Sequence, residues 1–196
     1  MTSPATRGKG LLEPFLARQR ARIANRLIPA GLRGGRILDI GCGSYPYFLS
    51  HTHFAEKFAV DQLAAPTGVR GISWHSLDLN SAPSLPFEEA FFSAVTLLAV
   101  IEHLSPASLA ELFREAYRVL VPGGLVILTT PASWSDGLLH TMARIALVSR
   151  EEIQEHVFAY TLPLIGWYFG TAGFAMQKLR FGYFELGLNL WATAQR

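Results

Sequence analysis

Hydrophobic residues in the middle of the chain fall into short apolar runs that alternate with helical patterns. The runs are residues 36–40, 57–60, 71–75, 94–99 and 125–130. Continuous apolar runs of this length are typical of strands buried on both faces. The clearest helical pattern spans 106–120, with Ser105 at its N-cap and Pro106 in its first turn. Strands alternating with helices predict a parallel sheet with helices on both faces.

A helical pattern also precedes the first strand. An apolar stripe and three arginines fall on different faces of this predicted covering helix, which ends at Pro29 and Gly31. The stripe is Leu12, Leu16, Ile23 and Leu27, and the arginines are Arg18, Arg22 and Arg26. A solvated basic face and a patch for membranes or phosphate groups both fit these arginines.

The last third of the chain has a different pattern. A turn at 122–124 precedes the run at 125–130, and a helical insertion is expected over 133–158. Ser149 and Glu152 have the spacing of a capping box, so a helix is expected to begin there. Another helix is expected over 161–171. Two strands should follow, one opening at Gly173 and the other spanning 188–194.

Composition narrows the class of protein. Half of the 196 residues are hydrophobic and 16% are charged, but no uninterrupted apolar stretch is long enough to cross a membrane. The N-terminus lacks a signal-peptide pattern, and a lone cysteine, Cys42, excludes an internal disulfide. We therefore expect a cytoplasmic protein. A net charge of +2 is too small to indicate a nucleic-acid partner.

The segment from Asp39 to Gly43 links the first strand to the following helix. Glycine at positions 41 and 43 permits positive φ and lets a ligand approach the backbone closely. A dinucleotide fingerprint would require a third glycine where this chain has Pro46. The segment by itself therefore indicates only a nucleotide-like ligand.

Two acids follow the next two strands. Asp61 ends the second strand, where a carboxylate can accept hydrogen bonds from a ribose diol. Asp78 follows the third strand, where it could accept from an adenine amino group or cap a turn. Ligands of such sheets bind beyond the carboxyl ends of the strands, so both acids are expected at the same edge as the glycine loop.

Five sequence blocks in this order resemble the class I S-adenosylmethionine-dependent methyltransferases, most closely their small-molecule "type 11" branch. The blocks are residues 37–43, 60–61, 85–87, 100–104 and 115–124. The resemblance implies a Rossmann-like, doubly wound α/β fold with seven strands in the order 3-2-1-4-5-7-6 and the last strand antiparallel. It also implies one domain over 1–196. Its parts are a covering helix (1–31), a cofactor-binding core (36–131), an acceptor lid (132–172) and C-terminal strands (173–196).

The resemblance also implies a role for individual residues. Those implied to bind S-adenosylmethionine, or the product S-adenosylhomocysteine, are Asp39, Gly41, Cys42 and Gly43 around the methionine moiety, Asp61 and Gln62 at the ribose, Asp78 and Leu79 at the adenine, and Ala99 in the pocket wall. The family often has a third glycine where this chain has Tyr45, so the loop should differ from its relatives there.

The sequence contains few features that identify the methyl acceptor. Methyl transfer from a sulfonium is an in-line displacement in which positioning supplies much of the catalysis, and a base is needed only if the nucleophile must lose a proton. Candidate bases are His103, His156 and Tyr160, each with a structural role as the alternative. No residues have metal-ligand spacing, so no metal is expected. Apolar residues between 134 and 169 fit either core packing or a lid for an apolar acceptor.

We therefore expect methyl transfer to a small-molecule or lipid-linked acceptor, with at most peripheral membrane contact. Two alternatives remain. One is a non-catalytic subunit that binds S-adenosylmethionine, for which Tyr45 is the sequence hint. The other is a nicotinamide-dependent oxidoreductase, against which Pro46 counts.

Overall fold

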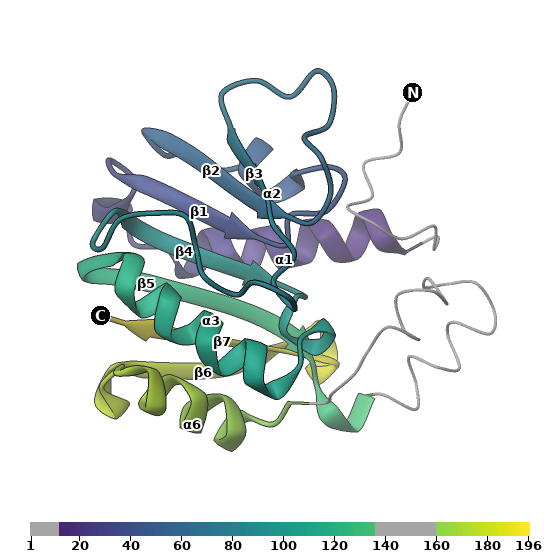
Figure 1. Ribbon diagram of the computed structural model, residues 1–196. Helices are drawn as coiled ribbons and strands as arrows, with labels where there is room; N and C mark the ends of the chain where they lie inside the picture. The colour runs from purple at the N-terminus through teal and green to yellow at the C-terminus, as the bar shows by residue number, and fades with distance from the viewer. Residues whose placement is uncertain (1–11, 136–159) are drawn as a thin grey trace.

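A seven-stranded sheet runs through the computed structural model, which describes residues 12–135 and 160–196 (Figure 1). The strands are β1 (Arg36–Ile40), β2 (Glu56–Asp61), β3 (Ser73–Ser76), β4 (Phe92–Leu98), β5 (Leu120–Pro131), β6 (Leu179–Phe184) and β7 (Asn189–Gln195). Their order is β3-β2-β1-β4-β5-β7-β6. Strands β1 to β5 pair in parallel, and β7 is antiparallel to both of its neighbours. The predicted order and strand directions are confirmed.

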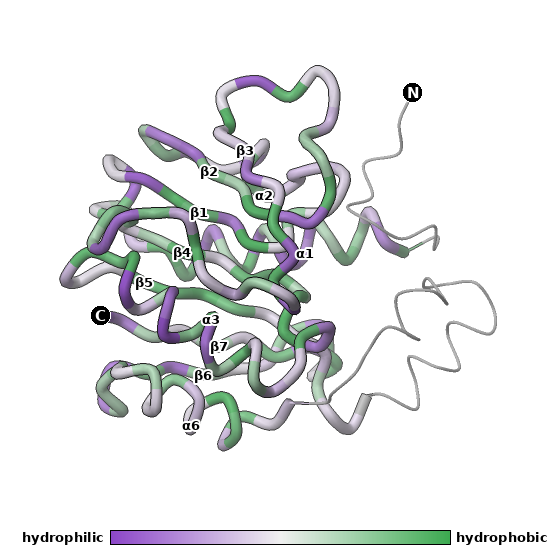
Figure 2. The backbone as a smooth tube through the Cα atoms, in the orientation of Figure 1, coloured by the Kyte–Doolittle hydropathy of each residue, from purple (hydrophilic) through white to green (hydrophobic). Residues whose placement is uncertain are grey.

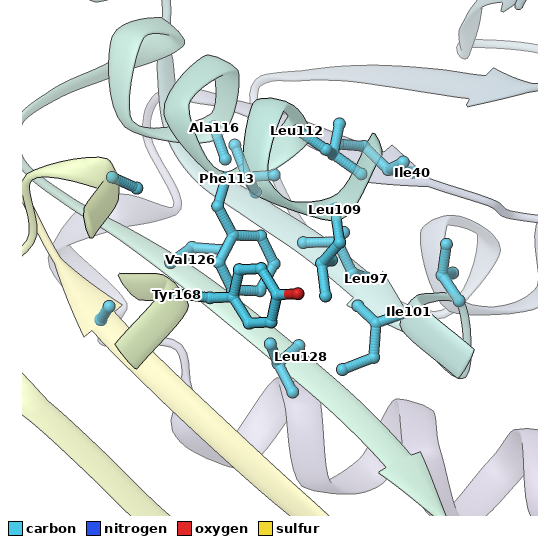
Figure 3. Close-up of a cluster of buried hydrophobic side chains, with 14 of the residues drawn as sticks. Ile40, Leu97, Ile101, Leu109, Leu112, Phe113, Ala116, Val126, Leu128 and Tyr168 are labelled. Atoms are coloured by element: carbon cyan, nitrogen blue, oxygen red, sulfur yellow. The ribbon is translucent and has the colours of Figure 1, made fainter. Parts of the chain in front are cut away.

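Helices cover both faces of this sheet. They are α1 (Glu13–Leu27), α2 (Tyr47–Ser50), α3 (Pro106–Val119) and α6 (Leu162–Ala172), joined by the 3-10 turns η1 (Ala30–Leu32), η2 (Ile101–His103), η3 (Ser133–Ser135), η4 (Met176–Lys178) and η5 (Glu185–Gly187). α1 and α2 pack on one face around Ile37 and Ile127. α3 and α6 pack on the other, where the rings of Phe113 and Phe169 stack 4.6 Å apart. Figure 3 shows this second cluster between α3 and β5.

The central strands are buried because both faces are covered. Every residue of β4 from Phe92 to Leu97 is buried, and β5 is largely hydrophobic along its length (Figure 2). The helix predicted over 106–120 begins and ends close to the expected residues. The Ser105 side chain accepts a hydrogen bond from the backbone N–H of Ser108, which confirms its capping role.

The predicted apolar stripe of α1 is only partly right. The buried positions are Glu13, Ala17, Ala21 and Ala24, whereas Leu16 and Ile23 are half-buried. Because alanines face the sheet, the helix backbone can lie close to it, and the larger apolar side chains lie at the margin of this contact. The three arginines of the predicted basic face are exposed.

Two boundaries differ from the sequence prediction. Gly173 does not open a strand: its φ of 108° places it in the left-handed region, where it ends α6, and β6 begins at Leu179. The turn expected at 122–124 lies inside β5, whose pairing with β4 skips from Leu120 to Leu125. The predicted helix start at Ser149 lies outside the described residues.

Two of the sequence blocks meet in one polar cluster. Glu115 of α3 accepts a hydrogen bond of 2.7 Å from the backbone N–H of Leu85 and is held by Arg118 at 2.6 Å. Arg118 also donates to the backbone carbonyls of Leu85 and Phe87, at 3.1 and 2.8 Å. The hydrogen bond from Arg118 is the main reason that the pKa of Glu115 lies below its ordinary value. This cluster joins the segment before β4 to α3.

We expect Arg118→Met to lower the free energy of unfolding by roughly 2–3 kcal/mol, because it leaves the Glu115 carboxylate without its cation. Arg114→Met is the matched control, since Arg114 forms an i,i+3 pair with Glu111 in which both side chains are exposed. That loss should stay below about 0.5 kcal/mol. Denaturant unfolding near neutral pH measures both, and equal losses would contradict the proposed importance of the cluster.

Candidate functional site

The carboxyl ends of β1, β2 and β4 lie side by side (Figure 1). Ile40 of β1 is opposite Val60 of β2 and Leu97 of β4. The segments that follow these three strands therefore meet at one edge. These segments carry the glycine loop, Asp61 and the turn η2, so the sheet brings together residues from three separate parts of the sequence.

The glycine loop, residues 39–43, is shaped by its close contact with the segment that follows β4. Gly41 has φ of 73°, and its N–H donates to the carbonyl of Val60 at 2.7 Å. A Cβ atom at this position would lie 2.5 Å from a methyl group of Val100. Gly43 also has positive φ, at 71°. Position 41 therefore needs glycine both for its backbone conformation and for space.

Asp61 connects this loop to β2. Its side chain is 1% exposed, and one carboxylate oxygen accepts from the backbone N–H of Gly43 at 2.7 Å. The other oxygen accepts from the N–H of Leu63 at 3.0 Å. Gln62 beside it is exposed, and its carbonyl accepts from the Ser76 hydroxyl at 3.2 Å. Asp61 is thus a buried carboxylate that is bonded to the backbone of the glycine loop.

Asp39 is a second buried carboxylate, one strand away. It is 3% exposed and accepts a hydrogen bond of 2.7 Å from the Thr96 hydroxyl. Burial raises its pKa to about 7, the hydrogen bond from Thr96 opposes this shift, and the charge of Asp61 adds to it. A cationic group bound nearby would offset that cost by favouring the ionised form. The pair of acids therefore suits a ligand that carries both an ammonium and hydroxyl groups.

The segment after β3 reaches the same edge. Asp78 is exposed and accepts from the backbone N–H of Asn80, whereas Leu79 is buried in the core. The Asn80 side chain donates to the carbonyl of His103 and accepts from the N–H of Ser105, both at 3.2 Å. Asn80 was not singled out from the sequence, where only its place directly after Asp78 and Leu79 hinted at it. It joins the segments after β3 and β4.

The segment after β4 begins at an unusual backbone conformation. Ala99 has φ of 58°, and its N–H donates to the carbonyl of Thr129. Glu102 is buried and accepts from the Thr130 hydroxyl at 2.9 Å, while His103 is half-buried. Ala99 and His103 therefore lie on the same edge as the glycine loop.

The other predicted site residues have different surroundings. Cys42 is buried in the α1 side of the core. Tyr45 is half-buried, with its ring tilted against Tyr47 at 6.4 Å. Tyr160 is 1% exposed and donates to the carbonyl of Leu104; burial raises the pKa of its hydroxyl. The raised pKa favours the protonated form of this hydroxyl, and a role for Tyr160 as a base stays a prediction. His156 lies outside the described residues.

Two absences apply to the part of the chain that the structure describes. Within residues 12–135 and 160–196, no group of three or more His, Cys, Asp or Glu side chains could hold a metal ion. Within the same residues, no helix is both long and apolar enough to span a membrane.

Comparison with known proteins gives one family match and many similar folds. Residues 12–179 match the family described as "Methyltransferase domain". A SAM-dependent methyltransferase from Archaeoglobus fulgidus superposes with a TM-score of 0.70 at 15% identity, over 92% of this chain and 94% of that one. One from Mesorhizobium loti gives 0.65 at 20% identity, over 92% and 100%. No curated protein sequence matches significantly. At these identities, the structural matches establish a shared fold.

We expect Gly41→Ala to lower the free energy of unfolding by about 2–4 kcal/mol, because a positive φ and overpacking against Val100 act together. Gly68→Ala is the control: Gly68 has φ of 86°, but a Cβ there would meet nothing within 4 Å. It should cost only about 1 kcal/mol. In a double-mutant cycle by denaturant unfolding, Val100→Ala should recover part of the loss in Gly41→Ala. Absence of coupling would contradict the steric argument.

Asp39→Asn should stabilise the protein at neutral and higher pH. The raised pKa means that, between the ordinary pKa of 3.8 and about 7, the folded state keeps a proton that the unfolded state releases. The free energy of unfolding therefore falls as pH rises through this range. Asparagine keeps an acceptor for Thr96 without the charge. We expect a gain on the order of 1–3 kcal/mol near pH 8 that disappears near pH 4. Thermal unfolding across pH measures it, and a pH-independent difference would contradict the assignment.

Proposed function

Because the chain belongs to the methyltransferase domain family and is a class I, S-adenosylmethionine-dependent enzyme, we propose that it methylates a small-molecule or lipid-linked acceptor. The observation that carries the proposal is the pair of buried carboxylates beside the glycine loop. Asp39 and Asp61 lie near the carboxyl ends of the adjacent strands β1 and β2, and Asp61 is bonded to the backbone of Gly43. Ligands of doubly wound sheets bind at this edge.

The residues at this edge fit the cofactor's chemical groups. We assign Asp39, Gly41, Cys42 and Gly43 to the methionine moiety, whose ammonium would favour the ionised form of Asp39. Asp61 and Gln62 are assigned to the ribose hydroxyls. Asp78 and Leu79 are assigned to the adenine, and Ala99 to the wall of the pocket. Polar groups of Asp78 and Gln62 are accessible for such contacts, because both residues are exposed.

The cofactor supplies a methyl group already activated on a sulfonium, so the protein's task is to position the two reactants. Asp61 holds the loop that would bind the methionine moiety by accepting from Gly43, and Asp39, held by Thr96, lies in β1 just before that loop. Asn80 holds the segment after β3 against the segment that carries His103. His103 is kept as the candidate base, for an acceptor that must lose a proton.

An apolar acceptor is supported by side chains beyond the ends of β5 and β6. Trp134 in η3 is 62% exposed, and Leu186 in η5 is 99% exposed. The two turns adjoin, since a Cβ on Gly187 would lie 3.4 Å from the ring of Trp134. The apolar residues predicted over α6 divide differently: Ile165 and Phe169 pack in the core, whereas Trp167 is exposed. The apolar surface near the site therefore comes from the turns rather than from α6.

Peripheral contact with a membrane remains part of the proposal for a lipid-linked acceptor, and nucleic acid is not proposed as a partner. A cytoplasmic location is proposed because the sequence contains one cysteine, Cys42, and therefore no internal disulfide. The alternative is a subunit that binds the cofactor without turnover. A methyl-transfer assay with labelled S-adenosylmethionine and cell extract separates the two: cofactor binding without labelled product would favour the alternative.

The cofactor assignment is tested by calorimetric titration with S-adenosylmethionine, S-adenosylhomocysteine and NAD. We expect both adenosyl compounds to bind, and Asp61→Ala to weaken each at least about tenfold because a charged hydrogen-bond acceptor is lost. Gln62→Ala is the control beside it and should lose less, since an exposed neutral side chain is removed. Binding of NAD alone would refute the cofactor assignment, and unchanged affinity in Asp61→Ala would refute the ribose contact.

A further inference from the structure

Three buried side-chain atoms have no hydrogen-bond partner among the described residues. They are Nε of Arg20, Oγ1 of Thr129 and Oε1 of Glu185. An unpaired polar atom that is buried destabilises the fold because it loses its hydrogen bonds to water, and such atoms are uncommon in folded proteins. The three belong to different elements, α1, β5 and η5.

Thr129 and the start of β7 share the face that α1 covers. Thr129 is opposite Trp191, and Pro131 is opposite Asn189. Because side chains alternate along a strand, Thr129 and Asn189 point to the same face. Ile127, two residues before Thr129, packs in the cluster that contains alanines of α1. Thr129 itself is 1% exposed. Its hydroxyl is thus enclosed between the sheet and the α1 layer.

Glu185 is bonded to Asn189, and the charge of Arg20 acts on Glu185. The Asn189 side-chain amide donates to Oε2 of Glu185, which leaves Oε1 as the unpaired atom. Burial raises the pKa of Glu185, and the positive charge of Arg20 opposes this shift. Glu185 and the next residue, Leu186, have φ of 51° and 56°. Two consecutive non-glycine residues in this region are costly, and the turn nevertheless holds Glu185 toward Asn189.

This cluster lies near the edge that holds the glycine loop. Thr129 is opposite Leu98, the last residue of β4, and its carbonyl accepts from the N–H of Ala99. β5 is two strands away from β1 in the sheet. Two strand spacings amount to roughly 10 Å, which is within the length of a small acceptor. The cluster therefore lies on the acceptor side of the cofactor site.

We propose that Arg20, Thr129, Glu185 and Asn189 form a binding site for a neutral hydroxyl group of the acceptor, which is therefore an alcohol or a phenol. A hydroxyl can donate to Oε1 of Glu185 and accept from Oγ1 of Thr129 or Nε of Arg20. A charged group fits less well, because an added buried charge would have to lose its hydration with no dedicated partner beside it. This inference rests on the proposed function and narrows its acceptor class.

The site is tested with phenol and with anisole, in which a methyl group replaces the hydroxyl proton and removes the hydrogen-bond donor. Their affinities are measured by ligand-observed NMR on the complex with S-adenosylhomocysteine. We expect phenol to bind about tenfold more tightly than anisole, as the gain of a hydrogen bond to a charged group predicts. Thr129→Val and Glu185→Gln should each reduce this preference severalfold. Equal affinity for both probes, no detectable phenol binding, or a preference unchanged in both variants would overturn the proposal.

A stability measurement separates a binding role from a purely structural one. Thr129→Val removes an unpaired hydroxyl, so it should leave the melting temperature unchanged or raised while weakening phenol. Thr130→Val is the matched control on the next residue. Its hydroxyl donates to Glu102, so this change should lower the melting temperature. A Thr129→Val variant that is destabilised like Thr130→Val would show that its hydroxyl is paired and overturn the site.

Failure of the hydroxyl site can be distinguished from failure of the proposed function. If the protein binds neither adenosyl compound, the proposed function fails, and the two probes are then compared on the free protein. If it binds S-adenosylhomocysteine but shows no preference for phenol, the hydroxyl site alone fails.

Discussion

The turn out of β1 depends on a contact that excludes any side chain at position 41. Gly41 packs against Val100, which follows β4, while its N–H bonds to Val60 at the end of β2. One residue thus holds the ends of three neighbouring strands at a fixed separation. Asp61 extends the same arrangement by accepting from Gly43. The position of the carboxylates, and hence the chemistry available at this edge, follows from that close approach.

The site is built at a cost to stability. Asp39 is buried beside another carboxylate, and burial raises its pKa to about 7. Removing such a group is expected to stabilise the fold and to harm ligand binding, a trade that is common at functional sites. Interactions elsewhere in the domain offset this loss of stability. The aromatic packing of α3 against α6 and the polar cluster of Glu115 and Arg118 stabilise elements that do not touch the proposed ligand.

The two faces of the sheet differ in the kind of side chain that they bury. On the α3 and α6 face, long apolar side chains pack closely, as Figure 3 shows for Phe113, Tyr168 and Leu128. On the α1 face, alanines contact the sheet, and polar side chains of β5 and β7 are buried beside them. Unpaired polar atoms therefore occur on the α1 face, at the edge where an acceptor is proposed. The closely packed α3 and α6 face keeps the sheet rigid beneath these atoms.

From the sequence alone, the resemblance of five ordered blocks to one family implied the sheet order, and local patterns located the glycine loop after β1 and the acids near the ends of β1, β2 and β3. The local patterns sufficed for the loop and the acids because a strand end, a glycine and an acid are adjacent in the chain. Element boundaries such as Gly173 and the start of β5 were missed, because a helix cap and a strand irregularity both place glycine between apolar residues. Only the tertiary structure decided which face of α1 is buried. It also decided that Asn80 joins two loops and that Asn189, which is bonded to Glu185, shares a face of the sheet with Thr129. Those residues are far apart in the chain, and their contacts depend on how helices and strands pack, which no local pattern records.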